Sequence, residues 1–189
     1  MRVIGGKFKG KKLLEPQDKE TRPLKDLTKE SIFNIINHSN KFSIDIKKAN
    51  VLDLFSGVGS FGIECLSHGA SYVTFVEKYE GVLPILKKNL NNLKSEINYE
   101  VIESDILSNF EFKSLKLGYD IVFLDPPYKE KALENILNKI IENRILKESG
   151  IIIIHRHKKE IDEFPKNFQL IDKKKIWDFQ NYIWILFLD

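Results

Sequence analysis

Residues 51–62 read VLDLFSGVGSFG, an apolar run that leads directly into a glycine-rich turn. The first half is typical of a buried strand, and Gly57, Gly59 and Gly62 give the spacing G-x-G-x-x-G. Glycines allow a backbone to turn tightly and to approach a ligand that a Cβ would repel. The segment therefore predicts a strand, a turn and a helix, with a small-molecule site at the turn. A plain strand–helix connection would give the same pattern, so other residues must decide between the two.

Apolar, strand-like runs alternate with helical stretches on both sides of this turn. The predicted strands are 51–55, 72–76, 99–103, 120–124 and 151–154. The predicted helices are 57–68 (with the turn), a stretch that ends near residue 93, and 131–146. Near-continuous apolar strands separated by helices predict a parallel sheet that is covered on both faces.

The end of the chain breaks this alternation. Residues 168–177 and 182–188 are two predicted strands with no helix between them, which indicates an antiparallel hairpin. The sequence therefore predicts an α/β fold with a mostly parallel seven-stranded sheet that ends in this hairpin. Such an ending resembles the Rossmann-like class I methyltransferase fold rather than a nicotinamide-binding domain.

The first 43 residues have a different character and are predicted to form a short basic extension. Residues 2–14 are predicted to form a small hairpin that turns at Gly5-Gly6, and residues 27–38 a helix. We expect this extension to pack on a methyltransferase domain of residues 44–189. Residues 1–14 contain five basic side chains and no acidic one, a patch suited to phosphates. The alternative is a solvated edge hairpin whose lysines discourage strand pairing.

Composition limits the class of protein. A hydrophobic share of 42% and a charged share of 30% are those of a soluble globular protein. No apolar run reaches the ~18 residues that a membrane span needs, and the first residues lack the apolar block of a signal peptide. Cys65 is the only cysteine, which excludes an intrachain disulfide, and His155 and His157 have no apparent third ligand. We expect a cytoplasmic protein without a metal.

Acidic residues near the glycine turn indicate the cofactor. Glu77 ends the second strand, where a carboxylate can accept both hydroxyls of a ribose. Asp53 would repel a pyrophosphate but would attract the ammonium and sulfonium groups of S-adenosyl-L-methionine, which favours this cofactor over NAD. Asp105 either accepts the adenine amino group or serves as the N-cap of a helix that begins at Ile106. The candidate cofactor-binding residues are Asp53, Phe55, Ser56, Gly57, Gly59, Glu77, Lys78, Asp105 and Asp125.

The fourth strand ends in Asp125-Pro126-Pro127-Tyr128, and its carboxyl end should open beside the glycine turn. The nitrogen of a base NH₂ or an amide attacks poorly because its lone pair is delocalised. A carboxylate and the carbonyl of Pro126 can accept both amino hydrogens and stabilise the positive charge that develops. The prolines make this edge rigid, and the tyrosine offers a face on which a base can stack. These four residues are the candidate catalytic residues; the alternative is a strand-ending Pro-Pro turn with a surface tyrosine.

Together, the glycine turn and Asp-Pro-Pro-Tyr resemble the nucleic-acid methyltransferases that act on amino groups. RVIGGKFKGKKL at 2–13, TRP at 21–23, KESIFN at 29–34 and FVEK at 75–78 are similar to the RsmD family of 16S rRNA (guanine(966)-N(2))-methyltransferases. The resemblance implies an N2-methylguanine product. It also implies a substrate of small-subunit rRNA in a partly or fully assembled particle, gripped in part by the basic extension. The candidate RNA contacts are Arg2, Lys7, Lys9, Lys11, Lys12 and Arg22.

Other interpretations stay open from the sequence. One is a methyltransferase acting on adenine N6, cytosine N4 or a glutamine amide, although a DNA enzyme would usually carry a target-recognition insertion. Another is a non-catalytic RNA-binding assembly factor that keeps the fold, and a third is an NAD oxidoreductase. The chain departs from the family pattern after the fifth strand, where His155-Arg156-His157 replaces a usual acid, and near the end, where Trp177-Asp178 replaces Tyr-Gly. We expect a monomer.

Overall fold

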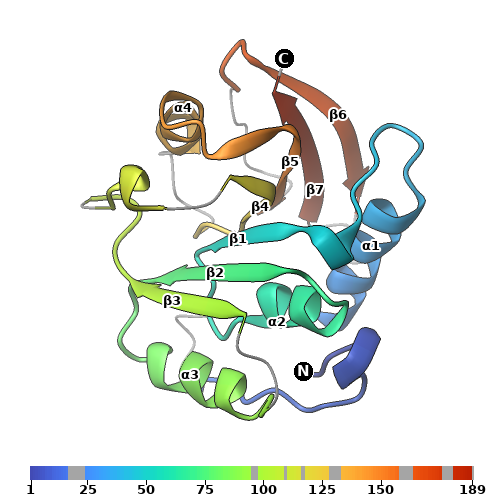
Figure 1. Ribbon diagram of the computed structural model, residues 1–189, viewed down its shortest axis with the longest axis vertical. Coiled ribbons are helices and arrows are strands. Elements are labelled where there is room, and N and C mark those ends of the chain that lie inside the picture. Colours follow the sequence, from blue (N-terminus) through green and yellow to red (C-terminus); the bar gives the residue numbers. More distant parts are fainter. Residues whose placement is uncertain are drawn as a thin grey trace.

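The computed structural model of the chain describes residues 1–16, 24–94, 98–108, 110–115, 118–127, 133–157, 164–175 and 181–188. Within these residues, seven strands form one sheet in the order β3-β2-β1-β4-β5-β7-β6 (Figure 1). The strands are β1 Asn50–Leu54, β2 Tyr72–Glu77, β3 Tyr99–Glu103, β4 Tyr119–Leu124, β5 Leu146–His157, β6 Phe168–Lys175 and β7 Asn181–Leu188. Strands β1 to β5 are parallel to one another, and β7 lies antiparallel between β5 and β6. The predicted fold class is thus confirmed.

Helices cover both faces of the sheet (Figure 1). On one face, α1 Asp26–His38, α2 Ser60–Ser67 and α3 Leu83–Asn91 contribute to one apolar cluster. On the other face, α4 Leu133–Glu142 packs on a second cluster. The short 3₁₀ helices are η1 Gly6–Phe8, η2 Ile46–Lys48 and η3 Phe112–Ser114. None of the helices among the described residues is long and apolar enough to cross a bilayer.

The predicted helix 131–146 is too long, and the predicted strand 151–154 is too short. The helix α4 ends at Glu142, and Arg144 adopts a left-handed conformation (φ 51°), which an α-helix cannot continue through. Strand β5 begins at Leu146, which pairs with Tyr119 of β4. The register then shifts, and pairing continues between Ile151 and Ile121. Apolar residues continue at helical spacing beyond the true end of α4, so the pattern alone does not show where the helix ends.

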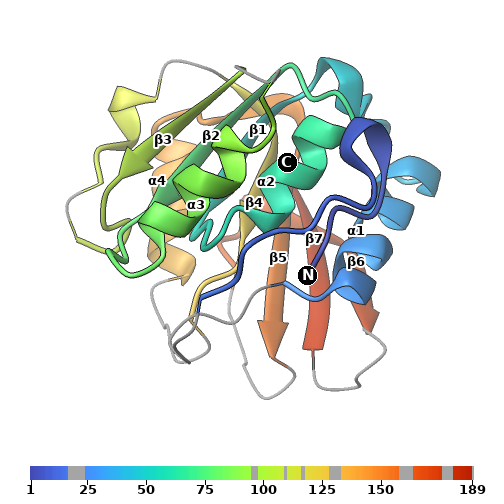
Figure 2. The ribbon, with the colours of Figure 1, turned by 90° about the horizontal axis from the view of Figure 1, so that it is seen from below.

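The N-terminal segment crosses α2 and α3 on the outside of the fold (Figure 2). Its single described β-bridge joins Arg2 and Lys12, so it has the path of a hairpin without regular strands. The turn is wider than the predicted Gly5-Gly6 turn because η1 occupies it. Gly6 has φ +68°, and a Cβ there would overlap the backbone carbonyl of Ser67, so this glycine allows the turn to pack closely on the end of α2.

Candidate active site

Four polar side chains lie in a row at the carboxyl edge of the sheet. Leu54 of β1 pairs with Val76 of β2 and with Leu124 of β4, which in turn pairs with Ile154 of β5, so four strand ends lie side by side. Side chains alternate between the faces of a sheet, which places the row on the face covered by α1 and α2. In spatial order, the residues of the row are Glu77, Asp53, Asp125 and His155.

Asp53 lies one side-chain level deeper than the other members of this row, and only 1% of its surface is exposed. Its Oδ2 accepts a hydrogen bond from the backbone N–H of Gly62, in the first turns of α2, at 3.0 Å. Burial raises the pKa of Asp53 well above its ordinary value, and the nearby carboxylates of Asp125 and Glu77 raise it further, although the Gly62 bond opposes this. The row therefore brings three carboxyl groups close together at one edge of the sheet.

Glu77 holds the glycine turn in place. Its Oε2 accepts from the N–H of Gly57 at 2.7 Å, and its Oε1 accepts from the N–H groups of Lys78 and Tyr79, both at 2.8 Å. A carboxylate offers about four acceptor directions, so these bonds leave it room for roughly one more donor. The sequence predicted a carboxylate that faces a ribose. It did not predict that Glu77 connects the end of β2 to the turn after β1, which is what its hydrogen bonds show.

The turn after β1 has three residues in the left-handed conformation: Phe55 (φ 61°), Gly57 (φ 56°) and Gly59 (φ 82°). Glycine adopts this conformation readily, but for a phenylalanine it stores strain of about 1–3 kcal/mol. Phe55 is partly buried against the α4 side of the core, and Ser56 donates its hydroxyl to the carbonyl of Asp53 at 2.6 Å. The turn is therefore a preformed loop that carries backbone N–H groups to the tip of β1.

Asp105 and Lys78 contact each other at the ends of β3 and β2. Lys78 Nζ donates to Asp105 Oδ2 at 3.0 Å, and Asp105 Oδ1 accepts from the N–H of Leu107 at 3.0 Å. Burial alone would raise the pKa of Asp105, but the bonds from Leu107 and Lys78 lower it below its ordinary value. Of the two roles predicted for Asp105, the local cap is visible, although it caps a turn and not a helix.

Asp125 follows β4 and is held by β5. Its Oδ1 lies 2.8 Å from Nδ1 of His155, and the side chains of the two residues are 21% and 8% exposed. The next residue, Pro126, is buried, and Pro127 is exposed. From the sequence, His155 was considered as a metal ligand without a third partner and as a departure from the family pattern. The pairing of Leu124 with Ile154 was the missing information, because it places the following residues of both strands side by side.

The basic residues of the N-terminal segment differ in their surroundings. Lys7, Lys9 and Lys12 are exposed, and Lys7 Nζ lies 5.2 Å from the ring centre of Phe8. In contrast, Lys11 donates to the backbone carbonyl of Asn92, and Arg2 pairs with Asp26 at 3.6 Å. The exposed lysines are therefore better placed than Lys11 or Arg2 to meet an external phosphate.

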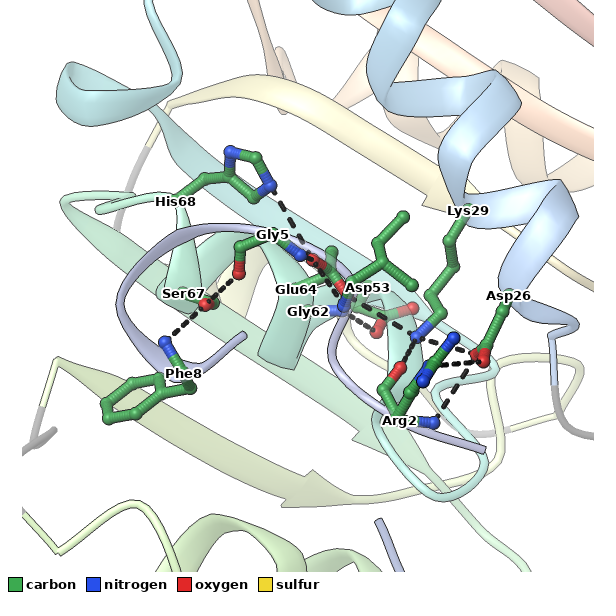
Figure 3. A network of polar contacts seen from close by, with 11 residues as sticks. Arg2, Gly5, Phe8, Asp26, Lys29, Asp53, Gly62, Glu64, Ser67 and His68 are labelled. Atoms are coloured by element: carbon green, nitrogen blue, oxygen red, sulfur yellow. Dashed lines mark hydrogen bonds and ion pairs between the residues drawn. The ribbon is translucent and has the colours of Figure 1, made fainter. Parts of the chain in front are cut away.

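Buried charges attach this segment to α2 (Figure 3). The side chain of Glu64 is fully buried and accepts from the backbone N–H groups of Ile4 and Gly5 at 2.9 and 2.7 Å. Lys29 of α1 is also fully buried, with Nζ 3.3 Å from Glu64 Oε2, and it donates to the carbonyl of Arg2. Burial alone would raise the pKa of Glu64, but bonds from His68 and Ile4 and the charge of Lys29 lower it.

Comparison with known proteins identifies the family. The family model described as "Conserved hypothetical protein 95" matches residues 1–185. The Ribosomal RNA small subunit methyltransferase D of Haemophilus influenzae is 34% identical over 175 residues, which cover 92% of this chain and 88% of that protein. The protein of the same name from Escherichia coli is 32% identical and covers 92% and 84%. The chain belongs to the RsmD family.

A solved structure agrees with this RsmD assignment along the whole chain. The structure from Escherichia coli described as a candidate methyltransferase, yhhF, has a TM-score of 0.81 and 30% sequence identity, and the match covers 100% of this chain and 98% of that one. Two predicted site residues, Arg22 and Tyr128, lie outside the described residues. The other predicted cofactor and catalytic residues lie at the ends of β1, β2, β3 and β4.

Proposed function

We propose that this RsmD-family protein transfers the methyl group of S-adenosyl-L-methionine to the exocyclic N2 amine of a guanine in small-subunit ribosomal RNA. The observation that carries the proposal is the position of Asp125 at the tip of β4, beside Asp53 and the glycine turn at the tip of β1. We further propose that the substrate is a partly or fully assembled particle and that the protein acts as a monomer.

The acids at the carboxyl edge fit a cationic cofactor. Glu77, Asp53 and Asp125 lie close enough for their charges to affect one another, and a cation bound among them would offset this repulsion. The backbone of Gly57 and Gly59 would lie against the cofactor, with Glu77 and Asp105 toward its ribose and adenine. When bound, S-adenosyl-L-methionine supplies a methyl group that its sulfonium already activates.

Asp125 is proposed to accept a hydrogen bond from the amine while the nitrogen attacks. The carbonyl of Pro126 would accept the second amino hydrogen, which directs the lone pair. Positive charge develops on the nitrogen during attack, and a fixed carboxylate stabilises it more than mobile water does. The proton then leaves to water, so Asp125 serves as a hydrogen-bond acceptor and need not act as a general base.

Identification of the methylated nucleoside tests this proposal. The wild-type protein and an Asp125→Ala variant would be incubated with labelled cofactor and with small subunits or free rRNA that lack the modification, and the RNA would be digested. We expect labelled N2-methylguanosine from the wild type and almost none from the variant. Labelled N6-methyladenosine, or equal labelling by both proteins, would exclude the proposed chemistry.

Asp53→Asn is expected to weaken cofactor binding by about 10–100-fold while it stabilises the free protein by about 1–2 kcal/mol. Folding raises the pKa of Asp53 above its ordinary value of 3.8. The free energy of unfolding of the wild type therefore falls as the pH rises from 3.8 through the raised pKa, because a buried carboxylate must then carry a charge. The gain from asparagine should therefore be largest at neutral pH and shrink in acid. Calorimetry with the cofactor and urea unfolding at two pH values measure both effects.

Asp120→Asn is the matched control, since it removes the same charge at the opposite end of β4, where Asp120 pairs with Lys147. This variant should keep its cofactor affinity. Unchanged affinity in Asp53→Asn would contradict the assigned role of Asp53.

The exposed lysines of the N-terminal segment are proposed to contact RNA phosphates at different distances from the site. Lys12 lies on the side of the glycine turn. The side chain of Asn89 donates both to the carbonyl of Leu14, two residues after Lys12, and to the carbonyl of Val58 in that turn. Lys7 and Lys9 lie at the far end of α2, whose eight residues span about 12 Å. The segment would therefore grip RNA along one side of the molecule, away from the reacting base.

Reversing the charge of Lys9 and Lys12 together is expected to weaken RNA binding and to lower the slope of log affinity against log salt by about 1.5. Lys11 is left intact because it holds Asn92. A variant with Glu at Lys48 and Lys113 has the same net charge and should keep the wild-type slope. An identical slope in all three proteins would remove the segment from the RNA interface.

A further inference from the structure

His155 is fixed on both sides within the sheet. It lies on β5 between β4 and β7, where it pairs with Ile183 of β7, and the preceding Ile154 pairs with Leu124. Its side chain is 8% exposed, and its Nδ1 lies 2.8 Å from Oδ1 of Asp125. The imidazole therefore contacts Asp125 from a rigid strand and not from a loop.

The neighbouring Arg156 contacts the same segment. Only 1% of its surface is exposed, and its Nη1 donates to the carbonyl of Pro127 at 3.5 Å, which is a long hydrogen bond. Successive residues of a strand point to opposite faces, so His155 and Arg156 approach the segment from two sides. His155 contacts the carboxylate of Asp125, and Arg156 contacts the backbone carbonyl of Pro127, so the segment is held at both ends.

The contact with His155 has a chemical consequence for Asp125. The terminal torsion of an aspartate is broad, so a free carboxylate would sample many directions. A carboxylate oxygen accepts hydrogen bonds, which requires that Nδ1 of His155 carries the hydrogen. With Oδ1 held in this way, the direction of Oδ2 is also set, and Oδ2 remains to accept from a substrate.

We propose that His155 is a positioning residue that sets the direction in which Asp125 accepts the substrate amine. The proposal rests on the proposed function, since it assumes that Asp125 contacts an amine. It assigns His155 no proton transfer and no direct contact with the substrate. Its effect should therefore appear in the rate of methyl transfer and not in the binding of either ligand.

The test compares His155→Ala, His155→Asn and His155→Gln. The side-chain nitrogen of asparagine lies near the position of Nδ1, whereas that of glutamine lies near Nε2. We expect alanine and glutamine to lower kcat about 100-fold, because misdirection of a reacting group by about 1 Å has this cost. We expect asparagine to stay within about fivefold of the wild type. KM for RNA and cofactor affinity by calorimetry should change less than threefold in all variants.

His38→Ala, which changes an exposed histidine at the end of α1, is the control and should behave as the wild type. The proposal is overturned if His155→Ala keeps the wild-type kcat, if asparagine is as slow as alanine, or if the loss lies in cofactor affinity alone. Folding of each variant is checked by urea unfolding, and the contrast between asparagine and glutamine remains if alanine does not fold.

A second measurement needs no RNA or cofactor. Long-range ¹H–¹⁵N NMR spectra of the free protein should show His155 protonated at Nδ1, and Asp125→Ala should abolish this preference; protonation at Nε2 alone would overturn the proposal. The two proposals also fail differently. If the labelled product is not N2-methylguanosine, the proposed function fails, whereas the order of the His155 variants on the actual product still tests the positioning role.

Discussion

Replacing Asp125 with alanine is expected to lower kcat for methyl transfer by about 10²–10³-fold at saturating cofactor and RNA. Loss of one fixed group that stabilises developing charge typically has an effect of this size. Without the carboxylate that His155 contacts, the variant would neither direct the amine nor stabilise the positive charge that develops on its nitrogen. The measurement is single-turnover transfer of labelled methyl, which separates chemistry from product release.

Two further variants make this result specific. Asp125→Asn keeps one acceptor oxygen, so it should lose only about tenfold. Asp120→Ala changes an aspartate at the other end of β4 and should keep most of the wild-type kcat. A kcat for Asp125→Ala within threefold of the wild type would contradict the role of Asp125, and Asp120→Ala excludes a general effect of losing an acid from this strand.

Much of the fold follows from the sequence because most strands are buried on both faces and therefore apolar throughout. The runs around Val51, Val73 and Ile121 contain almost nothing but apolar residues, and all three are fully buried. The start of β5 could not be predicted in this way, since residues 147–149 are polar and exposed although they belong to the strand. Only Leu146 in this part pairs with β4, through Tyr119, and regular pairing resumes at Ile151 after a register shift; pairing of this kind leaves no mark in a pattern of apolar residues.

The sequence indicates which residues lie at a strand end, but it does not indicate which residues of neighbouring strands contact one another. Asp53 and Glu77 were selected from the sequence because Asp53 lies within the apolar run that leads into the glycine turn and Glu77 ends the next apolar run. Their hydrogen bonds to Gly62 and Gly57 depend on how α2 and β2 pack, which the sequence does not state. The contact between His155 and Asp125 likewise requires the register of β4 and β5.

The buried pair of Lys29 and Glu64 is the clearest case that sequence patterns miss, because charged residues are rarely fully buried. Lys29→Met is expected to lower the free energy of unfolding by about 3–5 kcal/mol, since it leaves Glu64 as a buried charge without its cation. It also removes the donor to the carbonyl of Arg2, and with it one attachment of the N-terminal segment. Urea unfolding measures the loss, and hydrogen exchange of residues 1–16 should rise.

The double variant Lys29→Met, Glu64→Gln distinguishes a lost charge pair from lost packing. Glutamine keeps an acceptor for the N–H groups of Ile4 and Gly5 without a charge, so the double variant should regain about 1–3 kcal/mol relative to Lys29→Met. Lys48→Met, at a side chain that is 86% exposed, should stay within about 0.5 kcal/mol of the wild type. If the double variant is no more stable than Lys29→Met, the cost lies in packing, and the buried ion pair does not hold the N-terminal segment on α2.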